Sequence, residues 1–597
     1  MKFLSELKRS HNCGELKPEA DGQEVVLMGW VDTRRDHGGL VFVDLRDRYG
    51  VTQLILDPSI ELTKAAKDFR NEYVVAIQGK VKKRPDGMIN DKLPTGGIEI
   101  EASRAEILSK AETPPIQVND DNVSEQMRLK YRYIDLRSTK LQKNLMTRHR
   151  LVAEIREALN AKDFVDVETP ILYKSTPEGA RDYLVPSRVH PGSFYALPQS
   201  PQTLKQLLMV SGMDKYYQIA RCFRDEDLRA DRQPEFTQLD LEMSFVDQED
   251  VLALNESLVK EIWKNMKGVD LPEFQRMTFE EAMNTYGSDK PDTRFGMKIQ
   301  DLAEHFKGCG FKVFEDAIEK KDGAVKAFLL SDSAKDLSRS KIDKLTKLAQ
   351  KSGAKGLVWV KWEAGKISSP VSKFFDEDKL QAIVRALGGK EGDCAFIIAD
   401  SWSTSCSVLG SLRLQLAREF GKVDKSKDSF LWVTDFPLLD FSPDDGRWYA
   451  MHHPFTAVGD EYVQDLLDGN EDKFGEMKAK AYDLVCNGYE IGGGSIRIHN
   501  SDQQNAMFRA LGIGEEEAQE RFGFFIEALK YGTPPHGGIA WGIDRVSMIL
   551  CDTEAIRDVI AFPKTAKAYD TMSDAPSLVD RDQLFELSIR VAKQESE

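Results

Sequence analysis

The chain has 597 residues, a net charge of −16, 41% hydrophobic residues and 30% charged residues. This length predicts about three or four domains, and the acidic balance argues against nucleic-acid binding through bulk charge. No window approaches about 18 uncharged apolar residues, the start lacks the apolar core of a signal peptide, and the seven cysteines are scattered without a C-x-x-C pair. We therefore expect a cytoplasmic protein without a membrane span, a disulfide frame or a structural zinc site.

The first 108 residues have the pattern of a small β-barrel. Strand-like runs are expected at residues 24–31, 40–45, 51–56, 73–81 and 98–103, with a helical stretch over 61–71 between the third and fourth. This order is typical of an OB-fold, a barrel that often binds single-stranded nucleic acid. Residues 1–110 hold 18 basic and 18 acidic side chains, so the acidic excess lies in the remainder.

The binding face of an OB-fold combines cations with aromatic rings that stack on bases. Arg34, Arg35 and Phe42 suit such a face, with Gln53 and Glu99 as hydrogen-bonding partners. Taken alone, an alternating aromatic such as Phe42 is more often a core residue. The barrel pattern therefore allows an RNA-binding face without establishing one.

Residues 109–140 contain Thr113-Pro-Pro115 and then a charged helix, which together indicate a hinge linker. An amphipathic helix over 141–162 follows and leads into a strand that stops at Pro170. Next comes a Pro/Gly loop with the embedded acid Glu178, a carboxylate that would ordinarily be solvated. A helix opened by prolines then carries Lys205, a cation suited to a buried carboxylate.

The stretch 221–240 is the most charged of the core, and both of its ends are strand-like. Its middle, residues 224–234, is expected to form a loop that joins two antiparallel strands. Arginine forks such as that of Arg224 bind phosphate and carboxylate oxygens, and neighbouring acids can hold them in place. Without further support, a salt-bridged and solvated hairpin tip explains the same residues.

Residues 288–425 are richer in Lys, Gly and Ser and contain no site-like string, so they are expected to form an α/β insertion. The core resumes at residue 426, and paired histidines at 452 and 453 lack the spacing of a zinc site. Asp483 and Glu490 lie seven apart, so one continuous strand would put them on opposite faces. A turn at Asn487-Gly488 could bring both to one Mg²⁺ ion together with ATP phosphates.

Three segments resemble the signature motifs of the class II aminoacyl-tRNA synthetases, and most closely those of the bacterial aspartyl type. Residues 141–170 resemble motif 1, residues 221–240 motif 2 and residues 531–548 motif 3. The resemblance extends over essentially the whole chain and implies an α+β multidomain fold. Its parts are an OB-fold anticodon-binding domain (1–108), a hinge linker (109–140), an antiparallel-sheet catalytic core (141–287 and 426–597, the latter with a C-terminal extension) and an insertion domain (288–425).

The resemblance also implies the site residues. The aspartate-binding residues would be Glu178, Ser200, Gln202, Lys205, Arg224, Asp240, His452 and Arg497. The ATP-binding residues would be Arg224, Asp225, Glu226, Gln233, Glu490, Gly542, Ile543, Asp544 and Arg545. Arg224 and Arg545 would be catalytic, because they would hold the α- and γ-phosphates of ATP. Asp483 and Glu490 would hold the metal.

In the barrel, the resemblance assigns anticodon contacts to Arg35, Phe42, Gln53 and Glu99. His37 and Gly87 resemble the pair in non-discriminating members, which charge both tRNA(Asp) and tRNA(Asn). Discriminating bacterial members usually carry leucine and lysine there, and a bulky cation beside the last anticodon base can penalise the wrong base. A loop histidine and a turn glycine would explain both residues without any role in specificity.

The implied reaction joins L-aspartate to tRNA through aspartyl-adenylate, with ATP as substrate and Mg²⁺ as metal, in a homodimer. The first step needs no protein base, since the attacking carboxylate is ionised near neutral pH. Lys205 with Arg497 favours an acidic amino acid over the asparagine or lysine of sister families. A discriminating enzyme and a non-catalytic RNA-binding paralogue are the alternatives; intact Arg224, Glu490 and Arg545 argue against the second. Charging of tRNA(Asn) would imply a downstream amidotransferase.

Overall fold

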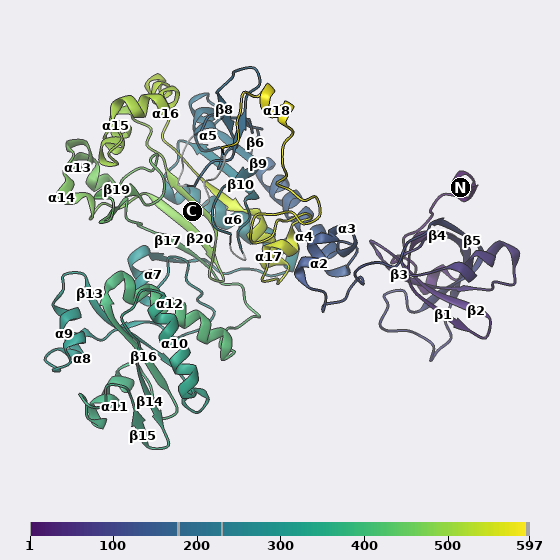
Figure 1. Cartoon of the computed structure of the whole chain (residues 1–597), viewed down its shortest axis with the longest axis horizontal. Coiled ribbons are helices and arrows are strands. Elements are labelled where there is room, and N and C mark those ends of the chain that lie inside the picture. Colours follow the sequence, from purple (N-terminus) through teal and green to yellow (C-terminus); the bar gives the residue numbers. More distant parts are fainter. Residues whose placement is uncertain (1, 176–179, 229–230, 593–597) are drawn as a thin grey trace. The chain divides into compact units, whose positions relative to one another are not determined.

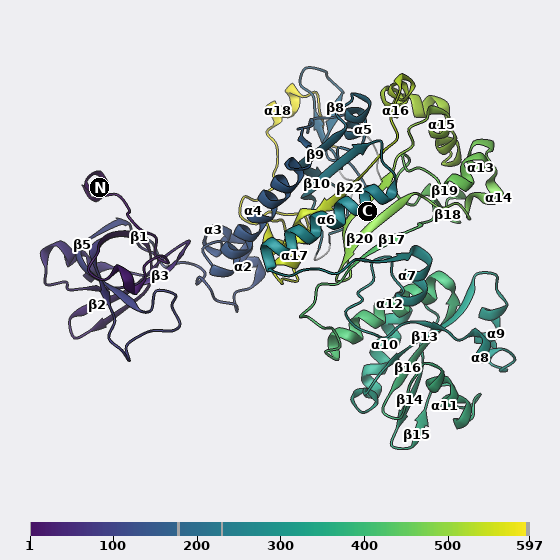
Figure 2. The same cartoon turned by 180° about the vertical axis from the view of Figure 1, so that it is seen from behind.

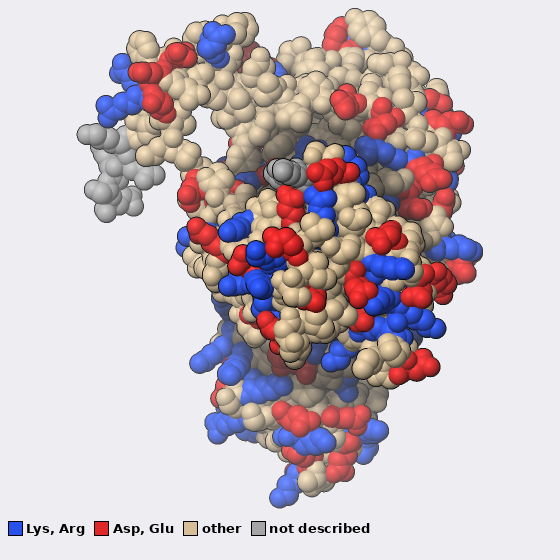
Figure 3. Space-filling view, turned by 90° about the vertical axis from the view of Figure 1, so that its right-hand side faces the viewer, with Lys and Arg blue, Asp and Glu red and all other residues tan. Residues whose placement is uncertain are grey.

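The computed structural model describes residues 2–175, 180–228 and 231–592. It divides into two compact units, residues 1–147 with 557–578 and residues 148–556 with 579–597. No helix in the described ranges combines the length and apolarity that a membrane span requires. On the face drawn in Figure 3, acidic and basic side chains are interspersed, so the net negative charge is not gathered there in one patch.

The first unit holds a closed five-stranded barrel with strand order β1–β2–β3–β5–β4, which confirms the predicted OB-fold (Figure 1). Its strands are β1 (Glu24–His37), β2 (Leu40–Asp47), β3 (Gly50–Leu56), β4 (Val74–Lys83) and β5 (Ile98–Ser109). The predicted helical stretch is a 3-10 helix, Glu61–Asp68, between β3 and β4. Alternate residues of β2 and β3, such as Val43 and Leu54, are fully buried inside the barrel. The intervening residues of these strands therefore face outward.

The rest of this unit includes α1 (Lys2–Glu6), α2 (Glu125–Lys130) and α3 (Arg132–Asp135). Buried charged side chains hydrogen-bond its segments to one another. Glu72 is buried and accepts from both Arg46 of β2 and Arg137, which follows α3. Arg132 donates to the carbonyls of Arg557, Ile560 and Ala561 at 2.7–2.9 Å. The bonds of Glu72 join the barrel to the hinge, and those of Arg132 join the hinge to residues 557–561.

An eight-stranded sheet forms the centre of the second unit, with the order β11–β17–β20–β21–β22–β10–β9–β6. The inner strands pair antiparallel, as predicted for the core, whereas β11–β17 and β6–β9 pair parallel. The strands are β6 (Val165–Asp166), β9 (Lys215–Phe223), β10 (Glu235–Ser244), β11 (Gln275–Thr278), β17 (Phe430–Thr434), β20 (Ala481–Cys486), β21 (Tyr489–Ile496) and β22 (His536–Gly542). Apolar residues of α4 (Thr139–Asn160) and α6 (Gln248–Lys267) pack into its core.

Smaller elements surround this sheet (Figure 2). Two short hairpins are β7 (Leu184–Pro186) with β8 (Phe194–Ala196), and β18 (Leu439–Ser442) with β19 (Arg447–Ala450). The helices near this sheet also include α5 (Gln202–Val210), α7 (Phe279–Tyr286), α13 (Val463–Asp468), α14 (Glu471–Phe474), α15 (Ser501–Ala510), α16 (Glu515–Ala528), α17 (Ile543–Leu550) and α18 (Arg581–Glu586). Among them, α5 and α17 bring predicted site residues to the sheet.

Residues 300–419 form a separate antiparallel sheet, with order β12–β13–β16–β14–β15, that has a helix-lined core on each face. Its strands are β12 (Gln300–Asp301), β13 (Gly323–Leu330), β14 (Val358–Glu363), β15 (Lys366–Ser368) and β16 (Cys394–Ser401). The helices α10 (Arg339–Lys351) and α12 (Trp402–Glu419) contribute to one core, and α9 (Lys312–Glu319) and α11 (Glu377–Ala386) to the other. The short helix α8 (Ala303–Phe306) precedes α9.

Candidate active site and nucleic-acid-binding face

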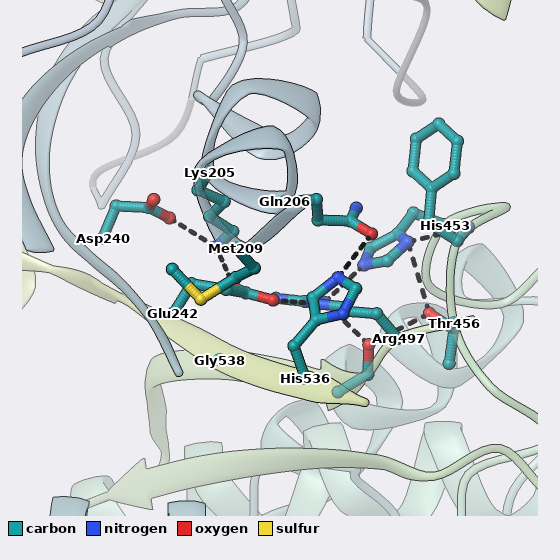
Figure 4. Close-up of polar contacts among 12 residues, drawn as sticks. Lys205, Gln206, Met209, Asp240, Glu242, His453, Thr456, Arg497, His536 and Gly538 are labelled. Carbon is teal, nitrogen blue, oxygen red and sulfur yellow. Dashed lines mark hydrogen bonds and ion pairs between the residues drawn. The ribbon is translucent and has the colours of Figure 1, made fainter. Parts of the chain in front are cut away.

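Strand β10 carries two acids, Asp240 and Glu242, whose side chains are fully buried. Because they are two residues apart, they lie on the same face of the sheet. Lys205 of α5 reaches between them, with Nζ 2.7 Å from Asp240 Oδ1 and 3.3 Å from Glu242 Oε2 (Figure 4). A buried cation thus compensates both carboxylates, as such burial requires.

Arg497, which follows β21, completes this cluster from the other side. Its Nε donates to Glu242 Oε1 at 2.8 Å and its second terminal nitrogen to Glu242 Oε2 at 3.1 Å, a bidentate pair. The first terminal nitrogen lies 2.7 Å from Ser495 Oγ and 2.8 Å from His453 Nε2. Since this guanidinium is only 2% exposed, the network holds it in one orientation.

The two acids differ in their affinity for a proton. Burial raises the pKa of Asp240 against the opposing charge of Lys205. Burial also acts to raise the pKa of Glu242, but Arg497 and Lys205 outweigh it and lower that pKa to about 2. Burial, with the charge of Arg497, holds the pKa of His453 well below its usual range, and burial lowers the pKa of His536. Glu242 is therefore ionised and both imidazoles are neutral near pH 7.

Lys205, Asp240 and Arg497 of this cluster line a cavity that contains seven of the eight predicted aspartate-binding residues. They are Ser200, Gln202, Lys205, Arg224, Asp240, His452 and Arg497. The eighth, Glu178, lies outside the described residues. Two buried polar atoms of this set, Asp240 Oδ2 and Gln202 Nε2, lack a partner in the described part of the chain, so an acceptor and a donor remain for a ligand.

A second cavity adjoins the first, and the two share Arg224, Glu226, Gln238, Glu490 and Ala540. It is also lined by Gln233, Gly542, Asp544 and Arg545. Of the predicted ATP-binding residues, Asp225 and Ile543 are not part of its lining. Ile543 is buried in the hydrophobic core, and the backbone N–H of Asp225 donates to the carbonyl of Arg181.

Three of the charged side chains that line this second cavity are held differently. The guanidinium of Arg224 lies 5.1 Å from the centre of the Phe236 ring and makes no ion pair with any described residue. Arg545 donates to the carbonyl of Glu490 at 2.7 Å and lies 3.3 Å from Asp231. Asp544 pairs with Arg148 and accepts from the Thr237 N–H at 2.8 Å. Asp544 thus fixes α17 against β10, whereas the arginines face the cavity.

Asp483 and Glu490 lie on one face of a β-hairpin. Asn487 and Gly488 have positive φ angles and turn β20 into β21, so that Glu490 lies opposite Val485, two residues from Asp483. The predicted turn therefore brings both carboxylates to one side. A side chain at Gly493 would meet Asp483 Oδ1 at 2.9 Å and Glu490 Oε1 at 3.5 Å, which explains the glycine.

Burial, and then the charge of Asp483, raise the pKa of Glu490, which indicates a place where a cation would be favourable. Carboxylate oxygens suit Mg²⁺, so the pair fits the predicted metal. Within the described ranges, no group of three or more His, Cys, Asp or Glu side chains is arranged to hold a metal ion. Ligand oxygens would therefore have to complete the coordination.

The barrel gathers the predicted anticodon residues on its outer surface, where alternation along β2, β3 and β5 places Phe42, Gln53 and Glu99. Arg35 of β1 lies opposite Phe42 of β2, and its guanidinium donates to both oxygens of Asp44 at 3.0 Å. The His37 ring packs edge-on against Phe42, with centroids 5.8 Å apart. Gly87 is exposed with φ +89, in a turn closed by the Met88 N–H and the Pro85 carbonyl.

Sequence reasoning missed Glu242 and His453, two members of the buried cluster. The alternation of β10 was a usable signal, because a residue two positions after Asp240 must share its face. His453 gave no such signal, since nothing in the sequence separates it from its neighbour His452. In the structure His452 lies 3.6 Å from Asp483 Oδ1, while His453 contacts Arg497.

Comparisons with known proteins agree with this arrangement. The family model for class II tRNA synthetases (D, K and N) matches residues 124–566, and that for the OB-fold nucleic acid binding domain matches residues 25–108. An aspartate–tRNA(Asp/Asn) ligase of Caldanaerobacter subterraneus subsp. tengcongensis is 52% identical over 592 residues, which are 98% of this chain and 99% of that protein. An aspartate–tRNA ligase of Staphylococcus carnosus is 52% identical over 589 residues, with the same coverage of both chains.

Among solved structures, asparaginyl-tRNA synthetase from Pyrococcus horikoshii complexed with asparaginyl-adenylate has a TM-score of 0.57 at 20% identity. The match covers 94% of this chain and 98% of that chain. Aspartyl-tRNA synthetase from Entamoeba histolytica also reaches 0.57, at 18% identity, and covers 94% of this chain and 92% of that chain. At such identities these structures establish the fold alone.

Proposed function

We propose that this chain, which belongs to the class II tRNA synthetases and within them to the aspartate–tRNA ligases, activates L-aspartate as aspartyl-adenylate before transferring it to tRNA. The observation that carries this proposal is the pair of adjoining cavities that share Arg224. One would hold aspartate over Lys205 and Arg497, and the other ATP between Arg224 and Arg545. Their common wall would bring the two substrates together.

In the first step an oxygen of the aspartate α-carboxylate attacks the α-phosphorus of ATP. A new P–O bond forms, the bond to the β-phosphate oxygen breaks, and pyrophosphate leaves with that electron pair. Arg224 and Arg545 would stabilise the charge that develops on the phosphate oxygens. In the second step a terminal ribose hydroxyl of tRNA attacks the aspartyl carbonyl carbon and forms an ester bond. The bond from that carbon to the phosphate oxygen breaks, AMP leaves with the electron pair, and the hydroxyl proton is released to solvent.

Asp483 and Glu490 would hold Mg²⁺ together with phosphate oxygens of ATP. When bound, the ion would neutralise phosphate charge and so favour the approach of the anionic aspartate. Without it, two carboxylates on one face would repel the phosphates. The raised pKa of Glu490 supports this assignment.

We further propose that the outer face of the barrel reads the anticodon, with Phe42 stacking on a base and Arg35, Gln53 and Glu99 contacting its neighbours. The contact between His37 and Phe42 supports a role for His37 in choosing between tRNA(Asp) and tRNA(Asn). Gly87 supports that role less, because its φ of +89 already favours glycine there. Charging of both tRNAs would imply an amidotransferase that converts Asp-tRNA(Asn).

The same proposal includes a cytoplasmic homodimer with motif 1 at its interface, as in the resembling family. The experiment that tests dual charging compares aspartylation of tRNA(Asp) and tRNA(Asn) transcripts by the purified protein. Charging of both at comparable kcat/KM would support it. Charging of tRNA(Asp) alone would refute the relaxed specificity and leave aspartate activation intact.

A further inference from the structure

The hydrogen-bond donors of Arg497 are almost fully used inside the protein. A guanidinium carries five N–H groups. Two bind the oxygens of Glu242, and one from the first terminal nitrogen faces His453 Nε2 (Figure 4). The other N–H of that nitrogen faces Ser495 Oγ. One N–H, on the nitrogen bound to Glu242 Oε2, remains without a partner among the described residues.

The N–H groups of Lys205 are likewise mostly bonded to acids of the protein. Of its three N–H groups, one binds Asp240 Oδ1 at 2.7 Å and a second faces Glu242 Oε2 at 3.3 Å. The third has no partner in the described part of the chain. Among the described residues, Glu242 is therefore the one acid that contacts both cations, and its position fixes which donor each cation keeps for a ligand.

We infer that Glu242 is a positioning residue that makes this pocket select a side-chain carboxylate over a side-chain amide. The inference rests on the proposed assignment of the cavity to aspartate. One free N–H on each cation matches the two oxygens of a carboxylate. An amide would turn its own NH₂ group toward one of these donors and leave it unpaired, which a buried site penalises strongly.

A purely electrostatic role for Glu242 makes the opposite prediction. Its charge repels an incoming carboxylate, so removal of that charge alone would strengthen aspartate binding. Removal of the Glu242 carboxylate would instead leave two N–H groups of Arg497 without their acceptor oxygens, so that the guanidinium could rotate. Removal of one partner of a buried charge pair leaves the other charge without compensation, so we expect the loss of geometry to outweigh the loss of repulsion.

The test uses the full-length protein and aspartate-dependent ATP–pyrophosphate exchange, which needs no tRNA. E242Q keeps the shape and removes the charge, whereas E242D keeps the charge and moves it by one methylene. For both variants we expect the KM for aspartate to rise at least about tenfold and the kcat/KM ratio of aspartate over asparagine to fall about tenfold. The KM for ATP should change less than about twofold, which a general structural defect would not spare.

The matched control is E72Q, because Glu72 is also buried between two cations, Arg46 and Arg137, but lies in the other unit. It should leave the aspartate-to-asparagine ratio unchanged. A lower KM for aspartate in E242Q, or wild-type selectivity in E242D, would overturn the inference; if E242Q does not fold, E242D decides. Absence of aspartate-dependent exchange in the wild-type protein would instead refute the proposed function.

Discussion

Replacement of Lys205 by methionine tests the aspartate pocket most sharply. The lysine Nζ lies 2.7 Å from Asp240 and 3.3 Å from Glu242, and all three side chains are at most 2% exposed. In K205M the free N–H proposed for the substrate carboxylate disappears, a loss of about 1.5–3 kcal/mol for a hydrogen bond to a charged group. The two acids would also face the substrate without the charge of Lys205 to offset them. Together these effects predict a fall in kcat/KM for aspartate of about a hundredfold or more.

The assay is aspartate-dependent ATP–pyrophosphate exchange at saturating ATP, with the KM for ATP measured in parallel. K267M is the control, because Lys267 likewise pairs with an acid, Asp428 at 2.8 Å, but lies away from both cavities. We expect K267M to keep wild-type kcat/KM for aspartate. A kcat/KM within about threefold of wild type in K205M would show that the carboxylate does not bind at Lys205.

Three further predictions concern other parts of the molecule. Burial lowers the pKa of both His453 and His536, so below about pH 6.5 the unfolded chain binds protons that the folded chain does not bind. The thermal midpoint should therefore fall from pH 7 to pH 5, and a constant or rising midpoint would contradict this. F42A should raise the KM for tRNA about tenfold or more by loss of base stacking and leave pyrophosphate exchange unchanged, whereas an unaltered tRNA KM would remove Phe42 from the RNA contact. G87K should reduce charging of tRNA(Asn) more than that of tRNA(Asp), with G87A isolating the backbone strain of about 1 kcal/mol; equal losses in both variants would assign Gly87 to the turn alone.

The barrel could be predicted because its strands alternate strictly. Val43 and Leu54 point inward while Phe42 and Gln53 point outward. The alternation therefore predicts both the barrel and the residues on its outer face. Motif-length strings likewise led to Lys205 and Arg497, which lie almost 300 residues apart in sequence yet both contact Glu242. Their partnership could not be read from the sequence, because no local rule links α5 to the end of β21.

Other features needed the structure because they depend on pairing between strands. The shared face of Asp483 and Glu490 follows from the hairpin register, which a count of residues along one strand cannot supply. Asp544, which was predicted beside ATP, lines the second cavity, and its two oxygens accept from Arg148 and the Thr237 N–H. Such use of a charge to hold α17 in place becomes visible only when the packed elements are known.

The central claim is that aspartate and ATP bind in two cavities that share Arg224 and react there to form aspartyl-adenylate. Pyrophosphate exchange in R224A tests this claim most directly. Arg221, which pairs with Glu235 at 2.6 Å and lines neither cavity, provides the control R221A. We predict that R224A loses exchange by a factor of about 100 or more while its affinity for tRNA stays within about twofold, and that R221A keeps wild-type exchange. Exchange at the wild-type rate in R224A would contradict the assignment of both cavities.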